Sequence, residues 1–504
     1  MSRFSLLFFA LFLVQLASAQ WCGTPQDAII PYLDANLANL VASQRGATKY
    51  IPVTFHLVAD ANGNGRVEEE NVLKQVLNFN NHYADQDFIF YIDHFNYFNN
   101  DAVYNMPFST LARTQMRIKR DNNSINIYIC KSADDGSGPG TTLAYYDPQE
   151  DWIVTAKGEV NGVSKTLNHE VGHFFSLAHT HLGWDCHPYT LAEYNNPVTL
   201  TSTLPCEEGG TAGSVLIELH DRSNCATAGD KICDTPEDYN LGLIYDPGCD
   251  PNQDIRDKNN QLITPDVTNF MSYYSGCDTN IFSATQKQLI NTDYFTPRRL
   301  YIRTGVVPKT TPVTEPVNYI SPINGNESNG IEDIVLDWDD VPGANRYLII
   351  YDRFQTFTFN PTKVFSNNST YTIPGPLGLG QTIYWKVWPF NESRTGAMYS
   401  ATQNFKVGEG TGINEIRDIQ DYMLNPNPVA NQQPVTLEMA VNQSFAADLK
   451  IIGASNRVLY QEKVNIPSGQ SSLPIKTEGL SAGVYFVTLN AISGRLVEKM
   501  LILE

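Results

Sequence analysis

The segment HEVGHFFSLAH, residues 169–179, combines residue types that bind a metal ion and use it for hydrolysis. His169 and His173 are four residues apart, so a helix places both imidazoles on one face, one turn apart. Neutral imidazole is a good zinc ligand, and three protein ligands leave a fourth position open for water. His179 is the third expected ligand. It reaches the same ion only if the helix ends near Ser176 and the chain turns back, so we expect a zinc site at the end of a short helix.

Glu170 directly follows the first expected ligand and is the expected general base. Zinc lowers the pKa of a bound water to about 7, and a carboxylate beside that water can accept its proton. Attack on a peptide carbonyl follows, and Glu170 passes the proton to the leaving amine. A bare H-E-x-x-H also occurs on surface helices. Here the neighbouring Val171, Phe174 and Leu177 are apolar, which indicates a buried helix.

The eleven-residue string resembles the signature of the metzincin metallopeptidases, H-E-x-x-H-x-x-G-x-x-H followed by a methionine turn. Ser176 stands where this signature has glycine. The bend before the third ligand favours a positive φ, which glycine adopts freely. A serine there carries a strain on the order of 1 kcal/mol, which a folded site can absorb. The departure affects the bend and leaves the three histidines unchanged.

Downstream, the run NFMSYYSGC that begins at Asn269 resembles the methionine turn of the pappalysin (cytophagalysin) family. The resemblance covers about residues 49–300. It implies that Met271 forms an apolar floor under the metal site and that Tyr273 approaches the zinc and stabilises the oxyanion of the transition state. A plain core methionine and a half-buried structural tyrosine are the alternatives.

The string GDKICDTP at 229–236 is also similar to pappalysin-type peptidases. Asp230 and Asp234 in it are candidates to bind calcium, or they build local turns. A second acidic loop begins at Asp60 and resembles half of an EF-hand. Its twelfth position is Asn71 instead of glutamate, so a polar turn is the favoured interpretation.

The N-terminus is typical of an export signal. Arg3 precedes an apolar run at 4–16, and Ala-Ser-Ala at 17–19 is a cleavage site, so residues 1–19 are expected to be a signal peptide. Residues 20–48 are then a propeptide. Its cysteine, Cys22, is a candidate cysteine switch, because a thiolate can occupy the open zinc position and displace the water. A disulfide from Cys22 to Cys130 is the alternative.

The remaining six cysteines lie within one irregular segment. In an exported protein such a cluster predicts disulfides, and a zinc–thiolate site is the weaker interpretation. Six cysteines allow 15 pairings, which the sequence leaves open. They are Cys186, Cys206, Cys225, Cys233, Cys249 and Cys277.

Strand and helix patterns predict a catalytic α/β domain at 49–305, with a twisted mixed sheet and the metal-binding helix. A Pro/Thr linker at 306–315 separates it from two all-β sandwich domains. Residues 316–408 resemble a fibronectin type III domain, with Trp338 in an early strand and the aromatic run IYWKVWPF in a late one.

Residues 420–504 resemble the C-terminal sorting domain of type IX secretion. The resemblance rests on a P-N-P opening and an L-x-x-G-x-Y close, with a basic, apolar tail. The matching residues are Pro426, Asn427, Pro428, Leu480, Gly483 and Tyr485. It implies export through this secretion machinery, to the medium or to the cell surface.

The net charge of −20 excludes nucleic acid as an expected partner, because phosphate backbones repel an acidic chain. After the signal peptide, no apolar run reaches the length of a membrane span. We therefore expect a secreted zinc endopeptidase that acts on proteins or peptides. One alternative is a gluzincin with Glu193 as third ligand. The other is a surface adhesin with a non-catalytic zinc site.

Overall fold

The computed structural model describes residues 22–40, 47–133, 142–185, 215–245, 249, 255–256, 260–306, 308, 310–328, 330–358, 361–395, 399–408, 416, 418–430, 433–453, 457–491 and 494–503. They form two compact units. The first takes the described residues up to Val313 together with 391–395, and the second takes the others. The expected signal peptide, Cys186, Glu193 and Cys206 lie outside the described residues.

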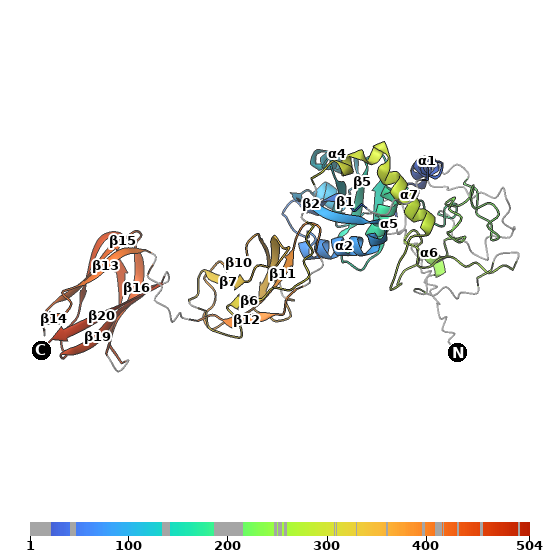
Figure 1. The fold of residues 1–504 in the computed structure, drawn as a ribbon. Coiled ribbons are helices and arrows are strands. Elements are labelled where there is room, and N and C mark those ends of the chain that lie inside the picture. Colours follow the sequence, from blue (N-terminus) through green and yellow to red (C-terminus); the bar gives the residue numbers. More distant parts are fainter. Residues whose placement is uncertain are drawn as a thin grey trace, which may run out of the picture. The chain divides into compact units, whose positions relative to one another are not determined.

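The first unit is built on a five-stranded sheet in the order β2-β1-β3-β5-β4 (Figure 1). β1, β2, β3 and β5 are parallel, and β4 runs antiparallel to β5 at one edge. β3 is buried along its whole length, as expected for a parallel strand that is covered on both faces. The mixed sheet confirms the α/β character predicted for this region. The strands are β1 (Lys49–Ala59), β2 (Phe88–Asn99), β3 (Ile125–Cys130), β4 (Ala144–Asp147) and β5 (Trp152–Ala156).

Helices α2 and α4 lie on opposite sides of this sheet (Figure 1). α3 and α4 pack on it through a cluster that includes Tyr128, Trp152 and Val154. On the other side, the Asn168 amide of α5 donates to Asn78 of α2 at 2.7 Å, so α2 and α5 are neighbours. α5 also contacts β4 and β5. The helices are α1 (Gln26–Leu37), α2 (Glu69–His82), α3 (Asp101–Asn105), α4 (Thr110–Lys119), α5 (Thr166–Phe174), α6 (Leu241–Tyr245) and α7 (Ala284–Phe295), with 3-10 turns at η1 (Ala84–Gln86), η2 (Lys157–Glu159) and η3 (Pro297–Arg303).

The second unit contains only strands among its described elements. Its first part has a three-stranded sheet, β10-β7-β6, and a four-stranded sheet, β12-β11-β8-β9. Trp338 of β7 and Trp385 of β11 are buried with ring centroids 6.2 Å apart, so the two sheets pack face to face. The strands are β6 (Tyr319–Ser321), β7 (Ile334–Trp338), β8 (Arg346–Asp352), β9 (Thr362–Ser366), β10 (Thr370–Ile373), β11 (Thr382–Phe390) and β12 (Gln403–Lys406).

The C-terminal part of the second unit is another pair of sheets, β13-β15-β18 and β14-β20-β19-β16-β17. One apolar cluster joins them, and its members include Leu437 of β15, Leu449 of β16 and Val487 of β19. The strands are β13 (Ile419–Asn425), β14 (Val429–Ala430), β15 (Val435–Val441), β16 (Phe445–Gly453), β17 (Val458–Ile466), β18 (Gly469–Ile475), β19 (Gly483–Ala491) and β20 (Gly494–Leu503).

Two disulfides join cysteines of the irregular segment, Cys225 to Cys233 and Cys249 to Cys277. Disulfides in this segment were expected, and these are two of the pairings that the sequence left open. Cys22 and Cys130 are both free and buried, so the alternative disulfide between them is wrong. No helix in the described part of the chain is long and apolar enough to span a membrane.

Candidate metal centre

The three histidines of the motif meet at one point in the first unit. His173 Nε2 lies 3.0 Å from His169 Nε2 and 3.1 Å from His179 Nε2. The first two come from successive turns of α5, and the third from the segment that follows it. All three side chains are buried. The structure therefore brings together the three nitrogens that the sequence motif singles out.

The other ring nitrogen of each histidine faces a hydrogen-bond acceptor. His169 Nδ1 donates to the Phe270 carbonyl at 2.7 Å, and His173 Nδ1 donates to the Leu177 carbonyl at 2.7 Å. His179 Nδ1 lies 2.5 Å from a carboxylate oxygen of Asp185. Carbonyl and carboxylate oxygens accept hydrogen bonds, so each Nδ1 carries the proton of a neutral ring.

It follows that three Nε2 lone pairs face one another with no proton between them. The three lone pairs repel one another. Burial lowers the pKa of all three histidines, that of His173 to about 4, so protonation of a ring does not relieve this repulsion. A bound cation does relieve the repulsion, and oriented neutral imidazoles are the ligands that zinc takes. The buried cluster can bind a metal ion, and its donor set fits zinc.

The chain reaches His179 through a sharp bend after α5. The helix ends at Phe174, and Ser176 has a φ of 69°. The Leu177 amide then donates to the Gly172 carbonyl at 3.0 Å. A helix that continued would turn His179 away from its partners, and the positive φ at Ser176 is the turn that the spacing requires.

Glu170 lies beside the three nitrogens, fully buried. Burial raises the pKa of its carboxyl to about 8, against hydrogen bonds from Thr24 and Cys22 that lower it. Within the described part of the chain, Oε1 of Glu170 has no hydrogen-bond partner. One carboxylate oxygen is therefore left for a ligand or water in the site.

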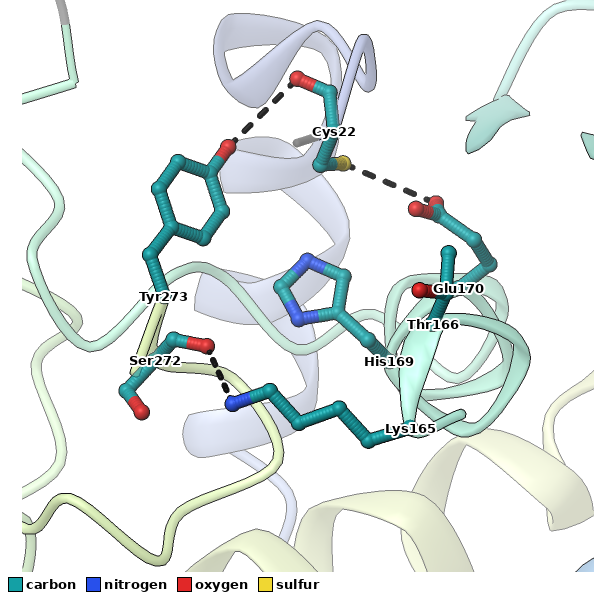
Figure 2. A pocket seen from close by; sticks show the side chains of 7 residues that line it. All are labelled: Cys22, Lys165, Thr166, His169, Glu170, Ser272 and Tyr273. Atoms are coloured by element: carbon teal, nitrogen blue, oxygen red, sulfur yellow. Dashed lines mark hydrogen bonds between the residues drawn. The ribbon is translucent and has the colours of Figure 1, made fainter. Parts of the chain in front are cut away.

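The residues of the predicted methionine turn also lie here. Met271 is buried beneath α5, where a Cβ added at Gly172 would meet its sulfur at 2.5 Å. The Tyr273 hydroxyl lies 3.4 Å from His179 Nε2 and donates to the Cys22 carbonyl at 3.4 Å. Figure 2 shows Tyr273 and Glu170 on opposite sides of His169, in a pocket that Cys22 also lines.

Cys22, near the start of the described chain, lines this pocket opposite His169 (Figure 2). Cys22 Sγ lies 3.4 Å from His173 Nε2, and it belongs with the three histidines to one group of possible metal ligands. Burial, and next the Glu170 carboxylate, raise the pKa of the Cys22 thiol well above its usual value. A thiolate at this position therefore needs a cation beside it.

Two further residues of this segment contact the site, and the sequence reasoning missed both. Thr24 Oγ1 donates to Glu170 Oε2 at 2.9 Å. Gln26 Oε1 accepts from the His179 amide at 3.1 Å. Asp185, which fixes the ring of His179, was missed too. Its only signal in the sequence is an acidic residue close behind the third histidine, as the support of a metal ligand requires.

The two aspartates proposed as calcium ligands lie in different surroundings. Asp230 is buried and accepts hydrogen bonds from the Thr235 hydroxyl at 2.9 and 3.0 Å. Asp234 accepts from the Ser283 hydroxyl and the Thr285 amide, both at 2.8 Å, at the start of α7. Asp230 makes the local bonds of the alternative, whereas the partners of Asp234 are 49 and 51 residues away in the chain. Calcium stays a prediction.

Comparisons with known proteins add one assignment. Residues 423–503 match the family model of a secretion system C-terminal sorting domain. No curated protein matches the chain. Similar solved structures include a promirolysin mutant from Tannerella forsythia, 15% identical over 56% of this chain and 97% of that one, with a TM-score of 0.38. The FN1–FN3 domains of chicken CNTN1 are 13% identical over 38% of this chain and 69% of that one, with a TM-score of 0.19.

A third solved structure, dimeric latent PorU from Porphyromonas gingivalis, is 16% identical over 39% of this chain and 20% of that one, with a TM-score of 0.15. The match to the sorting-domain model confirms the resemblance that the sequence predicted for 420–504. The chain ends in a type IX sorting domain, which directs it to the secretion machinery and so to the medium or the cell surface.

Proposed function

We propose that this chain is a secreted zinc endopeptidase of the metzincin type, with a pappalysin-like site that is made in a latent form. The observation that carries the proposal is the set of three buried Nε2 lone pairs, at His169, His173 and His179, beside the buried carboxyl of Glu170. The sorting domain supports an extracellular place of action. Met271 and Tyr273 would hold the floor and one wall of the site.

Zinc, when bound by the three histidines, supplies a Lewis acid that acidifies water and polarises a peptide carbonyl. Glu170 takes the proton of the attacking water and returns it to the leaving amine. Burial raises the pKa of Glu170 to about 8, which makes its carboxylate form a stronger base than that of an exposed glutamate. Burial also raises the pKa of Tyr273, which keeps its hydroxyl protonated as a donor for the oxyanion.

The leader, residues 20–48, would keep the enzyme latent by filling the site. With a metal bound, Cys22 would add a fourth donor to the three histidines in the position that water would otherwise take. Thr24 holds the general base through its bond to Glu170. Together the two contacts would block the metal site and the general base at once, as a cysteine switch requires.

The leader also indicates where a substrate peptide binds. The Gly23 amide donates to the Ala144 carbonyl at 2.9 Å, and the Tyr146 amide donates to Thr24 Oγ1 at 2.8 Å. Ala144 and Tyr146 belong to β4, the edge strand of the sheet. A substrate that replaces the leader would pair with this edge as an added strand, which suits extended peptides of many sequences.

Zinc content is the first test. Full-length protein is expected to carry one zinc per chain by mass spectrometry of metals, and His179→Ala to lose it. His220→Ala is the matched control, because His220 pairs with Glu237 at 2.8 Å and lies outside the cluster. A wild type without zinc would contradict the proposal. Zinc with no hydrolysis of any protein by leader-free material would favour a non-catalytic adhesin.

A further inference from the structure

The bend before His179 is held by side chains from outside the metal motif. Ser176 is buried with a φ of 69°, a conformation that is strained for a residue with a side chain. Its hydroxyl donates to Asp293 Oδ1 of α7 at 2.9 Å. A glycine at this position would adopt the same φ without strain, but it would make no such bond.

Arg299 of η3 joins Asp293 to the end of the metal-binding helix. Its Nε donates to Asp293 Oδ2 at 2.8 Å, and its guanidinium also donates to the Phe174 carbonyl. The guanidinium carbon lies 3.6 Å from the centre of the Phe174 ring. Phe174 is the last residue of α5, whose final carbonyls have no partner within the helix. Arg299 therefore supplies a hydrogen-bond donor for a carbonyl at the C-terminal end of α5, where the bend begins.

A second carboxylate fixes Arg299 itself. Arg299 Nη1 donates to Asp151 Oδ1 at 2.6 Å, and Asp151 also accepts from the Tyr301 hydroxyl at 2.8 Å. Arg299 and Asp293 are both buried. A buried guanidinium that is bonded to two carboxylates and a carbonyl has little freedom to move.

We infer that Asp293 is a positioning residue of the metal centre. With Ser176 and Arg299 it forms the bend cluster, which holds the left-handed turn and so places His179 at the metal. The inference rests on the proposed metal centre. It explains how serine serves at the glycine position of the motif: the hydrogen bond to Asp293 offsets the strain at Ser176.

The leader reaches the same carboxylate. Asn36 of α1 is buried, and its amide donates to Asp293 Oδ1 at 3.0 Å, on the oxygen that also accepts from Ser176. The leader thus touches the metal centre directly at Cys22 and through the bend cluster at Asn36. Variants of the bend cluster are therefore compared in the full-length chain, where this contact is the same in all of them.

The experiment measures zinc affinity by chelator competition, with thermal unfolding recorded in parallel. Asp293→Asn keeps the shape of the side chain and removes its charge. We expect it to weaken zinc binding about tenfold or more, the loss typical of groups that orient metal ligands. Met116→Ala, in the cluster under α4, is the control that lowers the unfolding temperature and leaves zinc affinity unchanged.

The decisive comparison uses Ser176. Ser176→Gly removes both the strain and the need for the bond, so zinc affinity is expected to stay within about threefold of the wild type, and Asp293→Asn made in that variant is expected to cost much less than it does alone. Ser176→Ala keeps the strain and loses the bond, so it binds zinc several-fold more weakly than Ser176→Gly. The comparison of Ser176→Ala with Ser176→Gly tests whether the bond to Asp293 supports zinc binding, even if Asp293→Asn fails to fold.

Two results would overturn the inference. One is that Ser176→Ala and Ser176→Gly bind zinc equally well. The other is that Asp293→Asn costs the same factor with serine or glycine at the bend. Both results leave zinc on the wild type. A wild type that binds no zinc contradicts the proposed function itself, so the two failures are distinguishable.

Discussion

The Thr24 hydroxyl donates a 2.9 Å hydrogen bond to the buried carboxyl of Glu170, while it accepts one of 2.8 Å from the Tyr146 amide. Thr24 of the leader thus bridges the proposed base, Glu170, and the edge strand β4 by hydrogen bonds. Thr24→Val keeps the shape and removes both bonds. Because a hydrogen bond typically contributes about 0.5–1.5 kcal/mol, we expect full-length Thr24→Val to show roughly two- to tenfold more residual hydrolysis than the wild type.

The measurement for Thr24 is hydrolysis of a quenched protein substrate by the uncleaved chain. Thr114→Val, on the exposed face of α4, is the matched control and is expected to match the wild type. Equal residual rates for Thr24→Val and wild type would mean that this bond does not contribute to latency.

Cys22→Ala tests the cysteine switch. Without the thiol, the fourth donor of the cluster is lost and water can enter, so the uncleaved precursor is expected to hydrolyse substrate at least tenfold faster than the wild-type precursor. Cys130→Ala is the control, because Cys130 is also a buried free cysteine but lies in the cluster under α4. A Cys22→Ala precursor that stays inactive would eliminate the switch.

How much of the site was predictable depends on the distance along the chain between contacting residues. The pair His169 and His173 follows from helix periodicity, and the break near Ser176 follows from the spacing to His179. Asp293 is 117 residues from Ser176, and its bond to that hydroxyl depends on how α7 packs, which no local pattern encodes.

The same distinction holds for the fold: local elements were predictable from the sequence, and pairings between distant segments were not. Strand and helix patterns predicted the α/β character of the first unit, and β3 is one of its strands, buried along its whole length as suits a covered parallel sheet. The order of the strands and the antiparallel edge strand β4 were not predicted, since pairing depends on contacts between distant segments. The disulfides were expected as a group, but their pairing needs positions in space.

Ionisation of the Asp151 carboxyl makes the free energy of unfolding depend on pH in the acid range. Burial alone would raise the pKa of Asp151, but Arg299, Tyr146 and Arg298 outweigh burial and bring it to about 2. The folded pKa thus lies below the unfolded value of about 3.9. The carboxylate therefore stabilises the fold fully above about pH 5, and this contribution, about 2–3 kcal/mol, is lost as the pH falls through 4 toward 2.

Urea unfolding between pH 7 and pH 2 checks this prediction, with a metal chelator present so that zinc release does not contribute. Asp151→Asn is expected to be less stable than the wild type at pH 7 and to lose less stability between pH 5 and pH 2. Parallel pH profiles for the two proteins would show that Asp151 is not the group responsible.

The most direct test of the account is the role of Glu170. Leader-free wild type, Glu170→Gln and the exposed control Glu68→Gln are compared for hydrolysis of a quenched protein substrate, with zinc counted in each. We predict that Glu170→Gln keeps one zinc per chain and loses about 10²–10⁴-fold in rate, the contribution of a positioned acid–base group, while Glu68→Gln matches the wild type. A zinc-loaded Glu170→Gln enzyme that cleaves as fast as the wild type would contradict the account.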